Sequence, residues 1–130
     1  MGLFSRKNKN GFIDIKIEKL IEWNQPNGEG CFVSNKITKD GFKVGYMYRD
    51  EPNPNMPDSG WKFMAGNEDD NYMHDTSNFN ILSINTICNY DKDIIPYIYS
   101  NIGSKYIRIN DSNFEIDDGS KPIFVTKQKN

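Results

Sequence analysis

Two runs of alternating apolar and polar residues, 31–38 and 43–50, flank the dipeptide Asp40-Gly41. Aspartate followed by glycine is a strong signal for a two-residue hairpin turn, because glycine adopts a positive φ without strain. A turn centred on this dipeptide places the apolar members of both runs on one face. The pattern therefore predicts a hairpin that pairs Ile37 with Val44, Asn35 with Tyr46 and Val33 with Tyr48.

A second alternating pattern, over 104–117 and centred on Asp111-Ser112, predicts another hairpin. Cross-strand neighbours in this register share a face of the sheet. The register pairs Ile109 with Phe114 and Ile107 with Ile116, and it places Arg108 opposite Glu115 on the outer face.

Two further strands are predicted outside these hairpins. Residues 60–66 alternate so that Trp61 and Phe63 share one face, and residues 122–126 are predicted to add an edge strand. Residues 79–90 are apolar and rich in β-branched side chains, which indicates a strand or a buried loop.

Three segments are candidates for short helices. Residues 12–23 fit both a strand and a helical stripe, and we favour a short helix. Asn67 is a suitable N-cap, and the three acids that follow it favour a helix that ends near residue 75. Asp93 is predicted to cap a helix over 94–100, with Pro96 tolerated in its first turn.

Hairpins with a few short helices predict an α+β fold on a mainly antiparallel sheet. The length of 130 residues suits one domain, which we place at residues 11–130 after a flexible basic tail at 1–10. The expected core combines the inward positions of both hairpins with one residue from 60–66 and one from 79–90. These residues are Val33, Ile37, Val44, Tyr46, Phe63, Ile87, Ile107, Ile109, Phe114 and Ile116.

Charge is unevenly distributed along the chain, although the net charge is only −2. Residues 50–93 hold nine acids and two bases, which gives this segment a charge of −7. One interpretation is a solvated face that keeps a small domain soluble, and the other is a surface that attracts a basic partner. The overall acidity gives no general field for nucleic acid, and no apolar run approaches the ~20 residues of a membrane span.

Few residues are suited to catalysis or metal binding. His74 is the only histidine and lies beside acids on a polar stretch, so a solvated surface position is expected. Cys31 and Cys88 lack the spacing of a metal motif and are expected to be small buried residues, reduced in a cytoplasmic compartment. The sequence therefore predicts no metal site, no cofactor and no catalytic residue.

Three segments together resemble a known bacterial family. They comprise 31–38 with 44–52, then 58–70, which contains Asp-Ser-Gly-Trp and Gly-Asn-Glu-Asp-Asp, then 85–91 with 94–96. They resemble the domain of unknown function 2185, grouped with immunity proteins of polymorphic toxin systems as the immunity-protein-33 type. The resemblance implies an α+β domain without known catalysis that neutralises a cognate toxin by binding it.

The acidic segment 50–75 is the predicted binding surface for such a toxin. Its candidate residues are Asp58, Glu68, Asp69 and Asp70 for acidic character, and Trp61 and Tyr72 as aromatic anchors. Trp61 fits the core equally well, and helix-start electrostatics alone would explain the acids at 68–70.

Two other hypotheses stay open. One is a small-molecule-binding or enzymatic domain that uses Trp61, Tyr48, Arg49 and nearby acids in a cleft, and the other is a plain scaffold with Trp61 buried.

Overall fold

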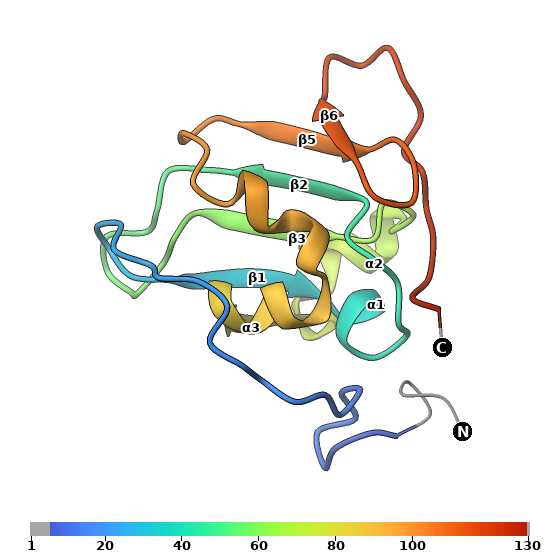
Figure 1. Ribbon diagram of the computed structural model, residues 1–130, viewed down its shortest axis with the longest axis horizontal. Coiled ribbons are helices and arrows are strands. Elements are labelled where there is room, and N and C mark those ends of the chain that lie inside the picture. The colour runs from blue at the N-terminus through green and yellow to red at the C-terminus, as the bar shows by residue number, and fades with distance from the viewer. Residues whose placement is uncertain (1–5, 130) are drawn as a thin grey trace.

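The strands of the computed structural model, which describes residues 6–129, form one six-stranded sheet in the order β4-β1-β3-β2-β5-β6 (Figure 1). The strands are β1 (Gly30–Ser34), β2 (Tyr46–Arg49), β3 (Trp61–Met64), β4 (Phe79–Ser83), β5 (Lys105–Arg108) and β6 (Phe114–Ile116). Only β1 and β3 run parallel, and every other neighbouring pair is antiparallel. The predicted α+β class with a mainly antiparallel sheet is confirmed.

The predicted hairpin over 31–50 is wrong. Strand β3 lies between β1 and β2, so the two runs that flank Asp40-Gly41 are not paired. The chain leaves β1 through helix α1 (Asn35–Thr38), and the Ser34 side chain caps this helix by accepting the Lys36 N–H at 3.2 Å. Gly41 does have a positive φ of 83°, but it follows a helical turn instead of closing a hairpin. Ile37 is buried four residues after Val33 on this turn, so both alternating runs still supply the core.

The second predicted hairpin forms, but its register differs by one residue. Arg108 pairs with Phe114, Ile107 with Glu115 and Tyr106 with Ile116. The Asn110 side chain accepts the N–H groups of Ser112 and Asn113, and the Ile109 N–H donates to the Asn113 carbonyl. These bonds close a three-residue loop, 110–112, where a two-residue turn was expected. Because a shift of one residue reverses the faces, Arg108 is 0% exposed and Ile116 is 72% exposed, the opposite of the prediction.

Two of the three predicted helices form, each with a different cap, and a helix also occupies part of 79–90, where a strand or a buried loop was predicted. Helix α2 (Asp70–His74) is capped by Asp69 instead of Asn67, and the 3-10 helix η3 (Lys92–Tyr97) is capped by Asp91 instead of Asp93. Residues 79–90 form β4 and then helix α3 (Ile84–Tyr90), which the Ser83 hydroxyl caps. A short 3-10 helix, η2 (Thr76–Asn78), precedes β4.

The helix expected over 12–23 is absent, and this segment is irregular. Asn85 and Asn89 of α3 hold it through its backbone: the Leu20 N–H donates to Asn85 at 2.8 Å and the Glu18 N–H donates to Asn89 at 3.0 Å. The segment is therefore held in place without a regular element of its own, and Leu20 and Ile21 pack against the core.

Backbone bonds also hold the segments near both ends of the described residues. No strand is assigned to residues 122–126, although the Phe124 N–H donates to the Arg108 carbonyl and the Lys43 N–H to the Thr126 carbonyl. The predicted tail 1–10 falls partly outside the described residues. Residues 6–10 make a turn in which the Asn8 N–H donates to the Phe12 carbonyl.

The core lies between the sheet and the layer formed by α3 and η3, which lie in front of the strands in Figure 1, whereas α2 lies behind them. The strand predicted at 60–66 is confirmed, and Trp61 and Phe63 stack in the core with ring centroids 5.7 Å apart. Seven of the ten predicted core residues are buried, Tyr46 and Ile109 are half-buried, and Ile116 is exposed. No helix among residues 6–129 is long and apolar enough to cross a membrane.

The register of the second hairpin can be tested by two alanine variants. Phe114→Ala should lower the free energy of unfolding by roughly 3–5 kcal/mol, because it leaves a cavity in the core. Ile116→Ala should change it by less than about 0.5 kcal/mol, because this side chain is mostly in solvent. Urea titration of both variants checks the expectation. Similar losses in the free energy of unfolding at both positions would support the register predicted from the alternation instead.

Candidate functional site

Trp61, a candidate anchor, lies in the core. Its side chain is 1% exposed, and its indole N–H donates to the Ile98 carbonyl at 2.8 Å. Arg49 pairs with Trp61 across β2 and β3 and donates to the carbonyls of Ser59 and Ser100, both at 2.9 Å. Tyr48, the residue before Arg49, points to the opposite face of the sheet. The structure therefore does not bring Trp61, Tyr48 and Arg49 together in one cleft.

Three of the four predicted acidic residues bind backbone N–H groups of their own loops. Asp58 accepts from Asn53 at 2.8 Å and from Gly60 at 2.9 Å. Glu68 accepts from Ala65 and Gly66 at 2.8 and 2.9 Å, and Asp69 caps α2. These carboxylates fix the loops that carry them.

Asp70 and Tyr72 lie on α2. Asp70 is exposed, and Tyr72 is half-buried with its hydroxyl 3.4 Å from the Asn78 carbonyl. His74, in the last turn of this helix, is exposed as expected.

Neither cysteine has the properties of a nucleophile. Both are buried and free, as expected. Burial raises the pKa of the Cys31 thiol well above its usual value and that of Cys88 to about 12. Because the thiolate is the reactive form, both side chains act as small core residues. Among residues 6–129, no three histidine, cysteine or acidic side chains gather as a metal site would require.

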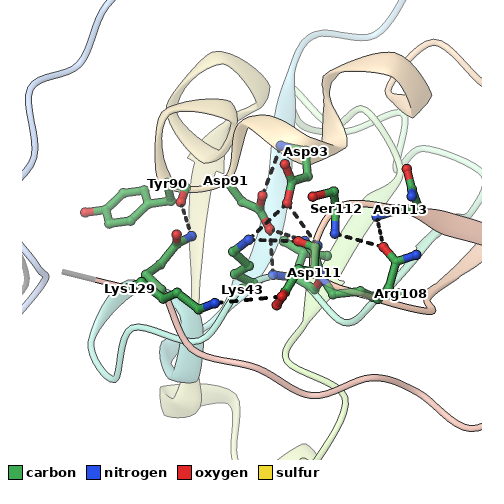
Figure 2. Close-up of polar contacts among 12 residues, drawn as sticks. Lys43, Tyr90, Asp91, Asp93, Arg108, Asp111, Ser112, Asn113 and Lys129 are labelled. Carbon is green, nitrogen blue, oxygen red and sulfur yellow. Dashed lines mark hydrogen bonds and ion pairs between the residues drawn. The ribbon is translucent and has the colours of Figure 1, made fainter.

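The densest polar cluster surrounds Arg108 (Figure 2). Its guanidinium donates to Asp91 at 2.8 Å, to Asp93 at 2.9 Å, and to the carbonyls of Val44 and Asp111 at 2.7 and 2.8 Å. The guanidinium also lies 4.6 Å from the centroid of the Phe114 ring. Four of the five N–H groups of this buried cation thus have an acceptor, and the Phe114 ring lies against the face of the guanidinium.

The acidic partners in this cluster are also satisfied. Asp91 accepts the Val44 N–H at 2.8 Å and the Asp93 N–H at 3.0 Å, in addition to Arg108. Burial raises the pKa of the Asp91 carboxyl, and the Arg108 charge and these N–H groups oppose the rise. A hollow of about 480 Å³ adjoins the cluster, but these hydrogen-bonded groups are not free to receive a ligand. The cluster therefore stabilises the fold and is not a candidate binding site.

The face of the sheet opposite α3 carries a continuous row of side chains across five strands. The pairing places Ile81 beside Phe32, Phe32 beside Lys62, Lys62 beside Tyr48, and Tyr48 beside Lys105. Ile81 is 54% exposed and Phe32 is 42% exposed. We call this side of the sheet the open face.

A groove of about 380 Å³ lies on the open face. Its lining is mostly apolar, and Lys62 supplies its only charged side chain among the described residues. The lining residues are Phe32, Tyr48, Lys62, Met64, Met73, Thr76, Phe79 and Ile81. The Lys62 ammonium lies 5.8 Å from the Phe32 ring and 5.6 Å from the Tyr48 ring, and pairs with Asp50 at 3.1 Å.

Acidic residues lie next to this groove in a neighbouring hollow. A smaller hollow of about 190 Å³ shares Phe32, Lys62 and Ile81 with the groove and is lined by Glu51 and Asp58. Helix α2 contributes Met73 to the lining of the groove, and Asp70 is the first residue of this helix. Part of the predicted acidic segment therefore lies beside an apolar surface that the sequence pattern did not predict.

The sequence does carry a signal for this surface, which is the pair of apolar residues on the outer face of β1 and β4. Phe32 stands between the buried residues Cys31 and Val33, and Ile81 precedes Leu82, so apolar residues occupy both faces of β1 and β4. Apolar residues on both faces are typical of a strand that is covered on both sides. Here the second side is open.

Comparison with protein-family models gives a match over most of the sheet. Residues 31–117, about two thirds of the 130 residues, match a family model described as the immunity protein Imm33 domain. The matched segment runs from β1 to the end of β6 and so contains the groove. No curated protein and no solved structure matches the chain.

We expect the loss of the buried Arg108 ion pairs to lower the free energy of unfolding much more than the loss of an exposed ion pair. Arg108→Met should lower the free energy of unfolding by roughly 3–5 kcal/mol at pH 7, because it leaves the Asp91 carboxylate buried without its cation. Lys121→Met, which breaks the exposed pair with Glu115, should lower the free energy of unfolding far less, because water screens this pair.

Lowering the pH should reduce the Arg108→Met deficit relative to the wild type. Without Arg108 the pKa of Asp91 lies further above its value in the unfolded chain, so folding takes up a proton and is favoured by acid. Urea titrations at several pH values measure both effects. Equal losses for the two variants, or a deficit that grows in acid, would contradict this account of the cluster.

Proposed function

The chain belongs to the Imm33 immunity protein family, and we propose that it neutralises a cognate bacterial toxin by binding it directly through the open face of the sheet. In this proposal the chain has no catalytic role and acts in the cytoplasm by covering the active site of the toxin. The observation that carries the proposal is the exposed apolar groove beside a hollow that Glu51 and Asp58 line.

The groove has the composition of a protein-binding surface. Interfaces commonly combine an apolar, aromatic centre with a polar rim, and a few central residues supply most of the binding energy. Phe32 and Ile81 are large, exposed and adjacent, which suits them to the centre. Exposed apolar patches of this kind commonly mark interaction sites in soluble proteins.

The acidic residues fit the rim of the same surface. We propose that Asp58, Glu68, Asp69 and Asp70 supply negative charge that speeds the approach of a basic toxin domain. Tyr72 is proposed as a contact at the α2 border, whereas Trp61 supports the sheet from the core. This assignment lets Glu68 and Asp69 attract a partner and fix their own loops at the same time.

Two matched substitutions test whether the open face binds the toxin. Ile81→Glu places a charge in the groove and should weaken binding of the cognate toxin by at least roughly 100-fold, about 2.7 kcal/mol. Ile116→Glu makes the same change at an exposed isoleucine of β6 and should leave binding unchanged. Calorimetric titration of the purified toxin domain measures the affinity, and growth of cells that produce the toxin measures protection.

Thermal unfolding of both variants is the control for folding. Protection that survives Ile81→Glu but fails with Ile116→Glu would place the interface on the other edge of the sheet. Protection by a wild-type chain that shows no binding to the toxin would contradict direct neutralisation.

A further inference from the structure

Strand β4 is an unusual edge strand. It lies at the end of the sheet and pairs only with β1. Its five residues, Phe-Asn-Ile-Leu-Ser, carry no charge, and no charged residue occurs between 76 and 90. Natural proteins usually protect an edge strand with charged residues, proline, a bulge or a covering element. The opposite edge follows this rule, because β6 has only three residues and pairs its Glu115 with Lys121.

The pairing with β1 shows which backbone groups of β4 face outward. The Ile84 N–H donates to the Glu29 carbonyl at 3.0 Å, so the hydrogen-bonded positions of this antiparallel ladder are Ile84, Leu82 and Asn80. The N–H and C=O of Ile81 therefore point away from β1, and no described residue outside the strand binds them. The Phe79 carbonyl and the Ser83 N–H point the same way.

These four backbone groups lie beside the groove. An added strand that pairs with Ile81 would direct alternate side chains onto the open face, next to Ile81 and Phe79. Addition of an extended segment to a sheet edge combines backbone hydrogen bonds with side-chain contacts, and this mode recurs in peptide recognition.

The charges around β4 favour a basic segment of another protein over a second copy of this chain as the added strand. Asp75 precedes the strand, Glu29 is bonded to Ile84 beyond its other end, and Glu51 and Asp58 line the adjoining hollow. A second copy paired antiparallel with the first would bring acidic ends together, which opposes self-association. A segment with basic side chains would meet charges of opposite sign.

We propose that the β4 edge accepts an extended segment of the toxin as a seventh strand, with an apolar residue beside Ile81 and basic residues near its ends. This inference rests on the proposed function and adds the form and charge of the partner segment.

Three capped heptapeptides test the proposal on the wild-type chain. The first alternates lysine and valine, the second replaces each lysine by glutamate, and the third replaces the central valine of the first by proline. The lysine peptide should shift the amide signals of Ile81 and Ser83 in NMR spectra and slow hydrogen exchange at Ile81. The glutamate and proline peptides should bind at least roughly 10-fold more weakly, about 1.4 kcal/mol.

A charge variant of the chain provides the matched comparison. Glu51→Gln combined with Asp70→Asn removes two exposed acids and should narrow the difference between the lysine and glutamate peptides. Asp14→Asn combined with Glu18→Gln removes the same charge from the N-terminal segment, where Glu18 lines the hollow near α3, and should leave the difference unchanged.

Several outcomes would overturn the inference. The Ile81 amide could stay unshifted with the lysine peptide at millimolar concentration, or the glutamate peptide could bind equally well. A dimer of the free chain with a protected Ile81 amide would assign the edge to a second copy. If any of these occurs while Ile81→Glu still abolishes toxin binding, the edge-strand inference fails and the proposed function stands.

Discussion

The hydrogen bonds and ion pairs of the buried Arg108 guanidinium hold the parts of this fold together. It joins three segments that are distant in the sequence: Val44 before β2, the acids at the start of η3, and the loop between β5 and β6. A fully buried cation is tolerated only where hydrogen bonds and opposite charge replace its hydration. Asp91, the partner of Arg108, also accepts the Val44 N–H. The same contacts therefore fix the start of η3 to the loop before β2 and to the β5–β6 hairpin.

This arrangement places the helical layer on one side of a small sheet. The core between the sheet and α3 with η3 takes up most of the large apolar residues. The opposite side keeps a mostly apolar row from Ile81 to Tyr48, in which Lys62 carries the charge, and α2 and η2 lie beside it. The acidic loops at 50–58 and 66–70 hold their shape through backbone contacts of their own carboxylates. The result is an apolar surface with a fixed acidic border, which is the feature that we connect with toxin binding.

Local sequence patterns predicted which strands exist better than they predicted which strands lie next to one another in the sheet. The strand at Trp61 and Phe63, the second hairpin and most of the core follow from alternation and burial preference. The first hairpin failed because a Ser34 cap starts a helical turn before Asp40-Gly41, and the parallel pairing of β1 with β3 is a long-range contact without a local signal. Arg108 was misplaced because Asn110 builds a loop one residue longer than expected. The acidic border was visible in the charge pattern, whereas Phe32 and Ile81 become a site only through the strand order.

Hydrogen exchange of the chain with and without its cognate toxin shows which side of the sheet the toxin covers. Binding through the open face should slow exchange in the complex at β4 and at the residues of the groove, including Phe32, Tyr48 and Ile81. It should leave exchange unchanged in α3 and η3, which lie on the covered side. Protection confined to residues 84–97, with the open face exchanging as in the free chain, would contradict the claim that the open face binds the toxin.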